Sequence, residues 1–143
     1  MTNTIPYLRL VVTQRCGLHC DFCHREGEQA APAAQGALPV AEIAAIVRTA
    51  VVCGVRKLKL LGGEPLLHPE LPRIVADARA ASTTLDISLI TAGVASADRL
   101  DACFDAGLDR ANMSVHGFGL AAFRERTKRG LAAFNTRERM LER

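Results

Sequence analysis

The sequence has 143 residues, of which 49% are hydrophobic and 23% are charged, and this composition predicts one globular domain and excludes a disordered chain. Its formal net charge of +3, from 18 basic and 15 acidic residues, is too small to favour nucleic acid or an anionic membrane as a partner. The apolar runs are shorter than the ~18 residues of a membrane-spanning helix, and no basic residue precedes Arg9, so we expect a cytoplasmic protein without a signal peptide.

Short β-rich runs alternate with segments of helical periodicity along the chain. In chain order, the predicted elements are a strand at 8–12, a helix between Pro39 and Gly54, a strand at 57–61, a helix at 69–80, a strand at 85–90, a helix at 96–106 with Ser96 as N-cap and Gly107 as C-cap, a strand at 111–115, and a helix that begins near residue 120. Residues 26–36, rich in Ala, Gln, Gly and Pro, are expected to form a surface loop.

Strands that alternate with helices predict an α/β fold with a parallel sheet. Right-handed crossovers place every helix on the same side if the sheet curls toward a (β/α) barrel. No linker or internal repeat divides the sequence, so residues 1–143 are expected to form one domain. The last strand would leave an exposed edge, which further strands, a partner subunit or self-association is expected to cover.

Five cysteines are distributed unevenly along the chain. Cys16, Cys20 and Cys23 lie within eight residues, whereas Cys53 and Cys103 lie singly among apolar residues. An odd number of cysteines with a tight cluster favours reduced thiols that bind metal or take part in catalysis over disulfides. The two isolated cysteines are predicted to be small buried hydrophobic residues.

Polar or glycine-rich segments follow all four predicted strands. They read TQRCGLHCDFCH at 13–24, GGEP at 62–65, TAG at 91–93 and SVHG at 114–117. Binding residues in parallel α/β sheets gather at the carboxyl ends of the strands. We therefore expect these four segments to form one site.

The spacing Cys16-x3-Cys20-x2-Cys23 brings three soft thiolates into one loop. Three thiolates hold three corners of an iron-sulfur cluster and leave the fourth iron open as a reaction site. The alternative from spacing alone is a structural zinc site with His19 or His24 as the fourth ligand.

Gly62 and Gly63 directly follow a strand, where they let the backbone approach a ligand closely, and Glu64 adds a carboxylate suited to an ammonium group. A tight turn between strand and helix explains the two glycines equally well when they are considered alone. The nearby thiolate cluster favours a combined site.

The CxxxCxxC loop with Phe22 before its last cysteine, followed about forty residues later by GGEP, resembles the radical S-adenosylmethionine (radical SAM) superfamily. The segments TQRC, CHREG at 23–27 and KLLGGEPLLHPEL at 59–71 resemble its MoaA-like branch, whose namesake cyclises GTP in molybdenum-cofactor synthesis. The resemblance covers essentially the whole chain. It implies a partial (β/α) barrel of radical SAM type, with about four of the usual six βα units present.

The resemblance also implies roles for individual residues. A 4Fe-4S cluster would bind to Cys16, Cys20 and Cys23, and S-adenosylmethionine would chelate its unique iron through the amino and carboxylate groups. The remaining implied contacts are Phe22 near the adenine; Gly62, Gly63 and Glu64 at the methionine amino group; Thr91 and Ser114 at the methionine carboxylate or ribose; and Arg15 near the cluster. Ala92 stands where many relatives have Asn, which removes a polar side chain or leaves its role to the backbone.

The implied activity is that of a radical SAM enzyme, or of its cofactor-binding part. One-electron reduction of the cluster cleaves S-adenosylmethionine, and the 5'-deoxyadenosyl radical abstracts hydrogen from a small-molecule substrate. The resemblance does not carry over the substrate, because the cysteines of a second, C-terminal cluster have no counterpart after Cys103. A flavodoxin or ferredoxin is the expected reductant.

Two alternatives to an enzyme acting alone stay open. One is a zinc-stabilised binding module without catalysis, and the other is a half-barrel subunit that holds the cluster for a partner. GGEP together with Thr91 and Ser114 at successive strand ends favours the enzyme over the zinc module, because zinc binding does not require these residues.

The remaining polar residues are expected to have structural or solvent-facing roles. His68 fits a loop or helix start, His19 is expected to be exposed, and His116 is expected to be a turn histidine bonded to the backbone, although its place after Ser114 would let it face a substrate. The run of Arg124, Glu125, Arg126, Lys128 and Arg129 predicts a solvated helix face that a phosphate-bearing substrate could use in part.

Overall fold

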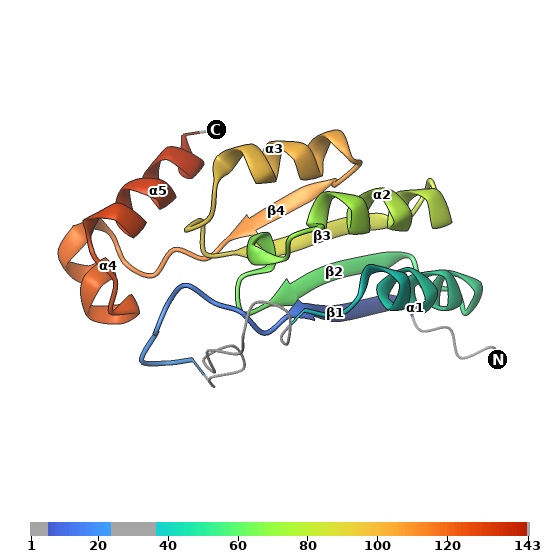
Figure 1. Cartoon of the computed structure of the whole chain (residues 1–143), viewed down its shortest axis with the longest axis horizontal. Helices are drawn as coiled ribbons and strands as arrows, with labels where there is room; N and C mark the ends of the chain where they lie inside the picture. Colours follow the sequence, from blue (N-terminus) through green and yellow to red (C-terminus); the bar gives the residue numbers. More distant parts are fainter. Residues whose placement is uncertain (1–5, 24–36, 143) are drawn as a thin grey trace.

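Four parallel strands form a single sheet in the order β1-β2-β3-β4. The computed structural model describes residues 6–23 and 37–142. In chain order its elements are β1 (Tyr7–Thr13), α1 (Val40–Val52), β2 (Lys57–Gly62), the short 3-10 helix η1 (Pro65–Leu67), α2 (Leu71–Ala81), β3 (Asp86–Thr91), α3 (Ala97–Asp105), β4 (Arg110–Met113), α4 (Gly119–Thr127) and α5 (Leu131–Leu141). The predicted α/β fold with a parallel sheet is confirmed (Figure 1).

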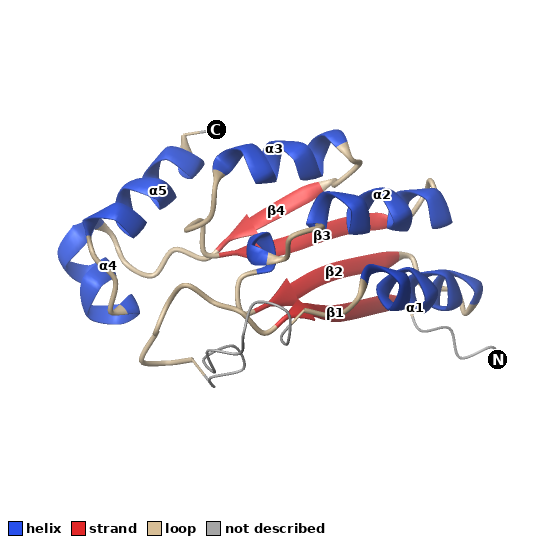
Figure 2. Ribbon diagram, viewed as in Figure 1, coloured by secondary structure: helices blue, strands red, loops and turns tan. Residues whose placement is uncertain are grey.

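Alternation along the strands gives the sheet one apolar face and one polar face. In β2, Leu58 and Leu60 are buried while Lys57 and Lys59 point the other way, as the two-residue period of a strand requires. The helices α1, α2 and α3 cover the apolar face (Figure 2). Their apolar stripes, which include Ile43, Val47, Ile74, Val75 and Leu100, pack on it, and each fully buried aliphatic side chain contributes about 1.5–3 kcal/mol.

The opposite face of the sheet, here called the open face, carries basic residues. The strand register places Arg9 beside Lys59, Lys59 beside Ser88, and Ser88 beside Arg110. A cavity of about 410 Å³ on this face is lined by Pro6, Tyr7, Lys57, Lys59, Ser88 and Arg110. Lys59 lies 6.0 Å above the Tyr7 ring, and Arg110 pairs with Asp86 at 2.7 Å.

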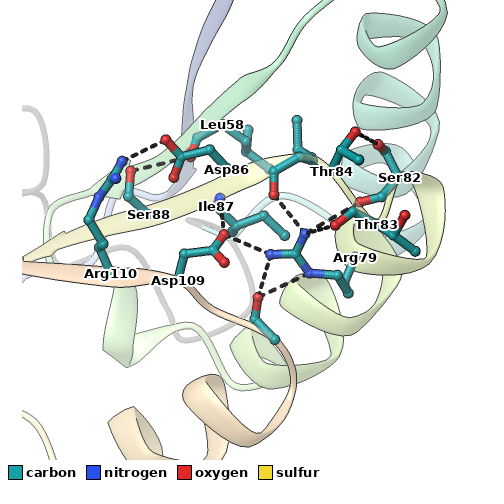
Figure 3. Close-up of polar contacts among 12 residues, drawn as sticks. Leu58, Arg79, Ser82, Thr83, Thr84, Asp86, Ile87, Ser88, Asp109 and Arg110 are labelled. Atoms are coloured by element: carbon teal, nitrogen blue, oxygen red, sulfur yellow. Dashed lines mark hydrogen bonds and ion pairs between the residues drawn. The ribbon is translucent and has the colours of Figure 1, made fainter.

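Arg79 joins α2 to the amino-terminal ends of β3 and β4 (Figure 3). Its guanidinium donates to the carbonyl oxygens of Leu85 at 2.7 Å and Gly107 at 2.9 Å, and to the Asp109 carboxylate at 2.7 Å. Asp109 also accepts from the Ile87 N–H at 2.7 Å. These bonds satisfy backbone groups at the end of the sheet farthest from the predicted site and fix the spacing of the two strands.

The carboxyl-terminal third departs from the prediction of one helix after residue 120. It contains two helices, because α4 ends at Thr127 and the next residue, Lys128, adopts the left-handed conformation with φ 55°. Gly107 follows the last turn of α3 with φ 105°. Residues just after a helix often adopt positive φ, and glycine does so without a steric penalty. Ser96 precedes α3 as predicted but its side chain makes no capping hydrogen bond. The 3-10 helix η1 was not predicted.

The two isolated cysteines differ from each other. Cys103 is fully buried in the core, as predicted, whereas Cys53 is exposed, so the prediction of a buried Cys53 was wrong. Cys53 follows the last turn of α1 and lies outside the stripe formed by Ile43 and Val47. The loop predicted at 26–36, like His24, lies outside the described residues. None of the helices described has the length and apolar character to cross a membrane.

Candidate active site at the carboxyl ends of the strands

The segments that follow the four strands meet around one cavity of about 170 Å³. The segment after β1 lies at the end of the sheet to which the strand arrowheads point in Figure 1, as does α4. Eight of the predicted site residues line this cavity, namely Cys16, Cys20, Phe22, Cys23, Gly62, Gly63, Thr91 and Ser114. The predicted segments therefore meet around one cavity, and the roles of these eight residues toward a cluster and S-adenosylmethionine stay predictions.

The two glycines after β2 allow close contact with the cysteine segment. The Gly63 N–H donates to the Thr13 carbonyl at 3.0 Å, and the Glu64 N–H donates to the Arg15 carbonyl at 2.7 Å. A Cβ at Gly63 would lie 2.4 Å from the Arg15 oxygen and 2.8 Å from the Cys16 Cβ, closer than non-bonded atoms approach. Glycine is therefore required for the cysteine segment to rest on the end of β2.

The three cysteines share one electrostatic environment. The pKa of Cys16 is raised, and that of Cys20 is raised to about 11. Burial is the main cause of both shifts. The negative charge of Cys23 raises both pKa values further, and that of Cys16 raises the pKa of Cys20. Thiolates in such a site are stabilised when a metal binds, because the metal replaces the lost solvation.

The donor set fits an iron-sulfur cluster by its chemistry. Three cysteines on one cavity supply the soft thiolates that such clusters take from proteins. In the part of the chain that the structure describes, no three side chains of His, Cys, Asp or Glu converge on a point that a single metal ion could occupy. His19, one of the two candidate fourth ligands of a zinc site, is exposed, as predicted.

The carboxyl end of α4 supports the cysteine segment from outside. The Thr127 carbonyl accepts from the His19 N–H at 3.0 Å, and the Arg126 carbonyl accepts from the Asp21 N–H at 3.1 Å. These carbonyls belong to the last turn of a helix, where they have no partner within the helix. The Arg129 guanidinium also donates to the Gly17 carbonyl.

The basic run at 124–129 thus has two roles. Its five charged side chains are exposed, as predicted for a solvated face, and Lys128 lies 3.9 Å from the Asp21 carboxylate. The contacts between this run and the cysteine segment join residues about a hundred positions apart. The sequence contained no periodicity that could have predicted them.

Glu64 connects the ends of β2 and β3 from inside the protein. The Glu64 side chain is fully buried and accepts from the Leu66 N–H at 3.1 Å, the Thr91 hydroxyl at 2.8 Å and the Ala92 N–H at 2.8 Å. Burial raises the pKa of Glu64, and these hydrogen bonds partly oppose that effect. The predicted role of Glu64 toward an ammonium group stays a prediction.

Two further predictions concern residues next to Glu64. The Ala92 N–H is used by the Glu64 carboxylate, so the backbone at this position stabilises the fold. Arg15 accepts from the Glu64 N–H and donates its own N–H to the Thr13 hydroxyl at 3.1 Å. Neither Arg15 nor Glu64 is among the residues that line the cavity, and the expected position of Arg15 near the cluster stays a prediction.

His116 belongs to the cavity wall, where sequence reasoning expected a turn histidine bonded to the backbone. Its ring centroid lies 5.0 Å from that of Phe22. Burial and then the charge of Arg137 lower the pKa of His116. The remaining lining residues that the sequence did not single out as contacts are Leu18, Leu61, Ile90 and Ala92. Leu61 and Ile90 could have been found from strand alternation, since they share a face with Lys59 and Ser88.

His68 is buried at the start of the segment leading into α2. Its Nε2 lies 3.1 Å from the Leu38 carbonyl oxygen, and its Nδ1 accepts from the Glu70 N–H at 3.2 Å. The prediction that His68 occupies a loop or helix start is confirmed.

Comparison with solved structures supports the same architecture. SuiB of Streptococcus suis, solved bound to S-adenosylmethionine, superposes with a TM-score of 0.70 over 87% of this chain and 27% of that chain, with 17% sequence identity. At this identity the likeness concerns the fold alone. The sheet of this chain thus corresponds to part of the SuiB fold.

Sequence comparisons extend the likeness to enzymes. GTP 3',8-cyclase of Chlorobaculum tepidum is 36% identical over 127 residues, covering 89% of this chain and 38% of the relative. GTP 3',8-cyclase of Microcystis aeruginosa is 39% identical over 115 residues, covering 79% of this chain and 35% of the relative. The chain therefore spans little more than a third of the length of these relatives. The family model of the Radical SAM superfamily matches residues 10–143, and the chain belongs to this superfamily.

Proposed function

We propose that this chain is a radical SAM enzyme of the MoaA-like group, or the cofactor-binding part of one. Cys16, Cys20 and Cys23 would hold a 4Fe-4S cluster, and S-adenosylmethionine would occupy the same cavity. The observation that carries the proposal is that the three thiols line one cavity with Gly62, Gly63, Thr91 and Ser114. A zinc-stabilised binding module would need the thiols but none of the other groups.

When bound, the cluster and S-adenosylmethionine supply one-electron cleavage of the carbon-sulfur bond and a 5'-deoxyadenosyl radical that abstracts hydrogen from the substrate. The residues of this chain would orient the cluster and S-adenosylmethionine and line the cavity around them. Gly62 and Gly63 bring the backbone of β2 against the cysteine segment. Phe22 and His116 form an aromatic wall, and Leu18, Leu61 and Ile90 exclude water.

The open face of the sheet supports a proposal about the substrate. Lys57, Lys59 and Arg110 line a cavity on this face, and Asp86 is the acidic partner of Arg110. Arg9 lies beside Lys59 in the register. Clustered cations of this kind favour phosphate or carboxylate groups, so we propose an anionic small-molecule substrate. Since relatives are named GTP 3',8-cyclase, GTP is the first compound to test.

The experiment is anaerobic reconstitution of the protein with iron and sulfide. Metal and sulfide analysis would follow, and then a dithionite-driven assay for 5'-deoxyadenosine formed from S-adenosylmethionine. We expect about four irons per chain, absorption typical of an iron-sulfur cluster, and 5'-deoxyadenosine. Bound zinc without iron-sulfur absorption would overturn the proposal in favour of the binding module.

Cysteine variants test which residues hold the cluster. Replacing Cys16, Cys20 or Cys23 by Ala should abolish both iron binding and 5'-deoxyadenosine formation, because each removes one of three ligands. The matched control is Cys53→Ala, since Cys53 is exposed at the end of α1. Equal losses in all four variants would contradict the ligand assignment.

We propose a partner subunit if the reconstituted protein binds the cluster but forms no 5'-deoxyadenosine. In that case the chain acts as a half-barrel subunit, and a second polypeptide that copurifies with it should restore cleavage. The proposed reductant is a flavodoxin or ferredoxin. Replacing dithionite by either reduced protein in the same assay tests whether it supports cleavage.

A further inference from the structure

Arg137 of α5 is a buried cation close to the cavity. Its side chain is only 2% exposed, and its guanidinium lies over the adjoining rings of Phe123 and Phe134, 4.8 Å from each ring centroid. It also pairs with the Glu138 carboxylate at 2.7 Å. Arginine is rarely buried to this extent unless it is paired, and an apolar residue packed on the two phenylalanines would avoid the desolvation cost of a charge.

The guanidinium makes one further bond, to the segment that follows β4. Arg137 donates to the Gly117 carbonyl at 2.9 Å. Gly117 has φ 117°, and a Cβ there would lie 2.8 Å from the Ala122 Cβ of α4. The chain therefore makes a tight, glycine-dependent turn at this point. Arg137 binds the carbonyl of that turn, one residue after His116.

His116 directly precedes Gly117 in this turn and lines the cavity. Its ring packs on Phe22, at 5.0 Å between centroids and 39° between planes. Phe22 belongs to the cysteine segment, so this contact joins the segments after β1 and β4. The side chain of Arg137 also lies near the segment after β3, where its Cγ would be 3.2 Å from a Cβ at Gly93.

We propose that Arg137 is a positioning residue that, through the Gly117 carbonyl, holds His116 against Phe22 as one wall of the cofactor cavity. Arginine suits this role because its planar group stacks on aromatic rings and donates several hydrogen bonds at once. A lysine keeps the charge but lacks the planar group that stacks on the rings and the forked arrangement of its donors. The inference rests on the proposed function only in naming the cavity's ligand.

The first test measures how accessible residue 22 is to solvent in the protein without iron, sulfide or S-adenosylmethionine. The chain has no tryptophan, so Phe22→Trp introduces a single indole whose fluorescence can be excited selectively. In this background, Arg137→Lys should release His116 and raise the acrylamide quenching constant of the indole by about twofold. Arg139→Lys is the matched control, because Arg139 is exposed on the same helix. Circular dichroism checks that each variant is folded.

A double substitution separates positioning from general loosening. If Arg137 acts through His116, then adding Arg137→Lys to a His116→Ala background should change the quenching constant no further. A further change of the same size, or an equal change in Arg139→Lys, would overturn the inference. If Arg137→Lys fails to fold, Phe134→Leu takes its place, since it removes one stacked ring and keeps the guanidinium.

The second test measures ligand binding in the reconstituted protein with Phe22 intact. Calorimetry with S-adenosylhomocysteine should show about tenfold weaker binding in Arg137→Lys and unchanged binding in Arg139→Lys. Unchanged affinity in Arg137→Lys would overturn the inference even if the indole responds. Failure of the proposed function gives a different result, namely no binding by the unsubstituted protein.

Discussion

Glu64 illustrates how a single side chain can serve the site without facing it. The Glu64 carboxylate is buried and all three of its partners donate hydrogen bonds. Through these bonds it sets the conformation of Thr91 and Ala92, which line the cavity. Burying a carboxylate is costly unless its oxygens accept hydrogen bonds. The three donors offset this cost and so stabilise the buried position of Glu64.

Glu64→Gln is expected to destabilise the protein by about 1–3 kcal/mol. Glutamine has the same shape, but its NH2 group cannot accept from the Ala92 N–H or from the Thr91 hydroxyl. One buried donor would therefore lose its partner. Urea unfolding measures the change, and Glu70→Gln is the control because Glu70 is exposed. Equal stability of the two variants would contradict the structural role of Glu64.

Gly63 gives a second prediction at the scale of one residue. Gly63→Ala places a Cβ 2.4 Å from the Arg15 oxygen, so the cysteine segment must move away from β2. We expect less iron to be bound after reconstitution and a lower midpoint of thermal unfolding. Gly130→Ala is the control, since nothing lies within 4 Å of a Cβ there. Normal iron binding by Gly63→Ala would show that the close approach is not needed for the site.

Side-chain direction explains which residue-level predictions hold. The sequence predicted eight lining residues, because CxxxCxxC and the strand ends fix their place along the chain. It did not predict that Glu64 points inward, or that His116 packs on Phe22. Turn residues lack the period that tells a strand's inner face from its outer face, so contacts between different turns appear only in three dimensions.

At the scale of elements, the strands were predicted closely and the last helix was not. The ends of all four predicted strands lie within two residues of those observed. The β-rich composition of each strand and the helical periodicity of the segments between them mark these boundaries in the sequence. The break between α4 and α5 occurs at Lys128, a residue that rarely adopts positive φ. Two interactions outside the helix accompany the break, namely the Lys128 pair with Asp21 and the Arg129 bond to Gly17.

Asp109 connects two strands and a helix, and this gives a prediction about pH. Burial raises the pKa of Asp109, but the Ile87 N–H and the bond and charge of Arg79 outweigh burial, so the pKa lies below its usual range. The ionised carboxylate therefore stabilises the fold above the pKa of an unfolded aspartate, near 3.8. This stabilisation is lost as the pH falls through the lower pKa of the folded state.

Asp109→Asn tests that linkage. The variant should be less stable than the unsubstituted protein near neutral pH, and its stability should fall less as the pH is lowered toward about 3. Urea unfolding across this range measures both effects. Asp105→Asn on the exposed side of α3 serves as the control. Parallel pH profiles for Asp109→Asn and the unsubstituted protein would contradict the role of Asp109.

At the scale of the whole molecule, the two ends and the two faces of the sheet are used differently. The amino-terminal end is held by Arg79 and Asp109, while the carboxyl end carries the cysteines and glycines of the cavity. One face is closed by α1, α2 and α3. Lys57 and Lys59 make the other face basic, and the cavity on that face lies toward the amino-terminal ends of the strands, since Tyr7, Lys57 and Arg110 are the first residues of β1, β2 and β4.

Lys59 lies at the centre of that basic face and tests the proposal of an anionic substrate. Lys59→Met keeps the length and apolar stem of the side chain but removes its charge, so GTP should bind about tenfold more weakly, equivalent to ~1.4 kcal/mol. The affinity of the unsubstituted protein should fall with added salt, because exposed charges are screened. Equilibrium dialysis with GTP measures both. Arg48→Met, which removes a charge from the exposed side of α1, should change nothing; equal weakening by the two variants would indicate that net charge alone attracts the nucleotide and that the open face does not bind it.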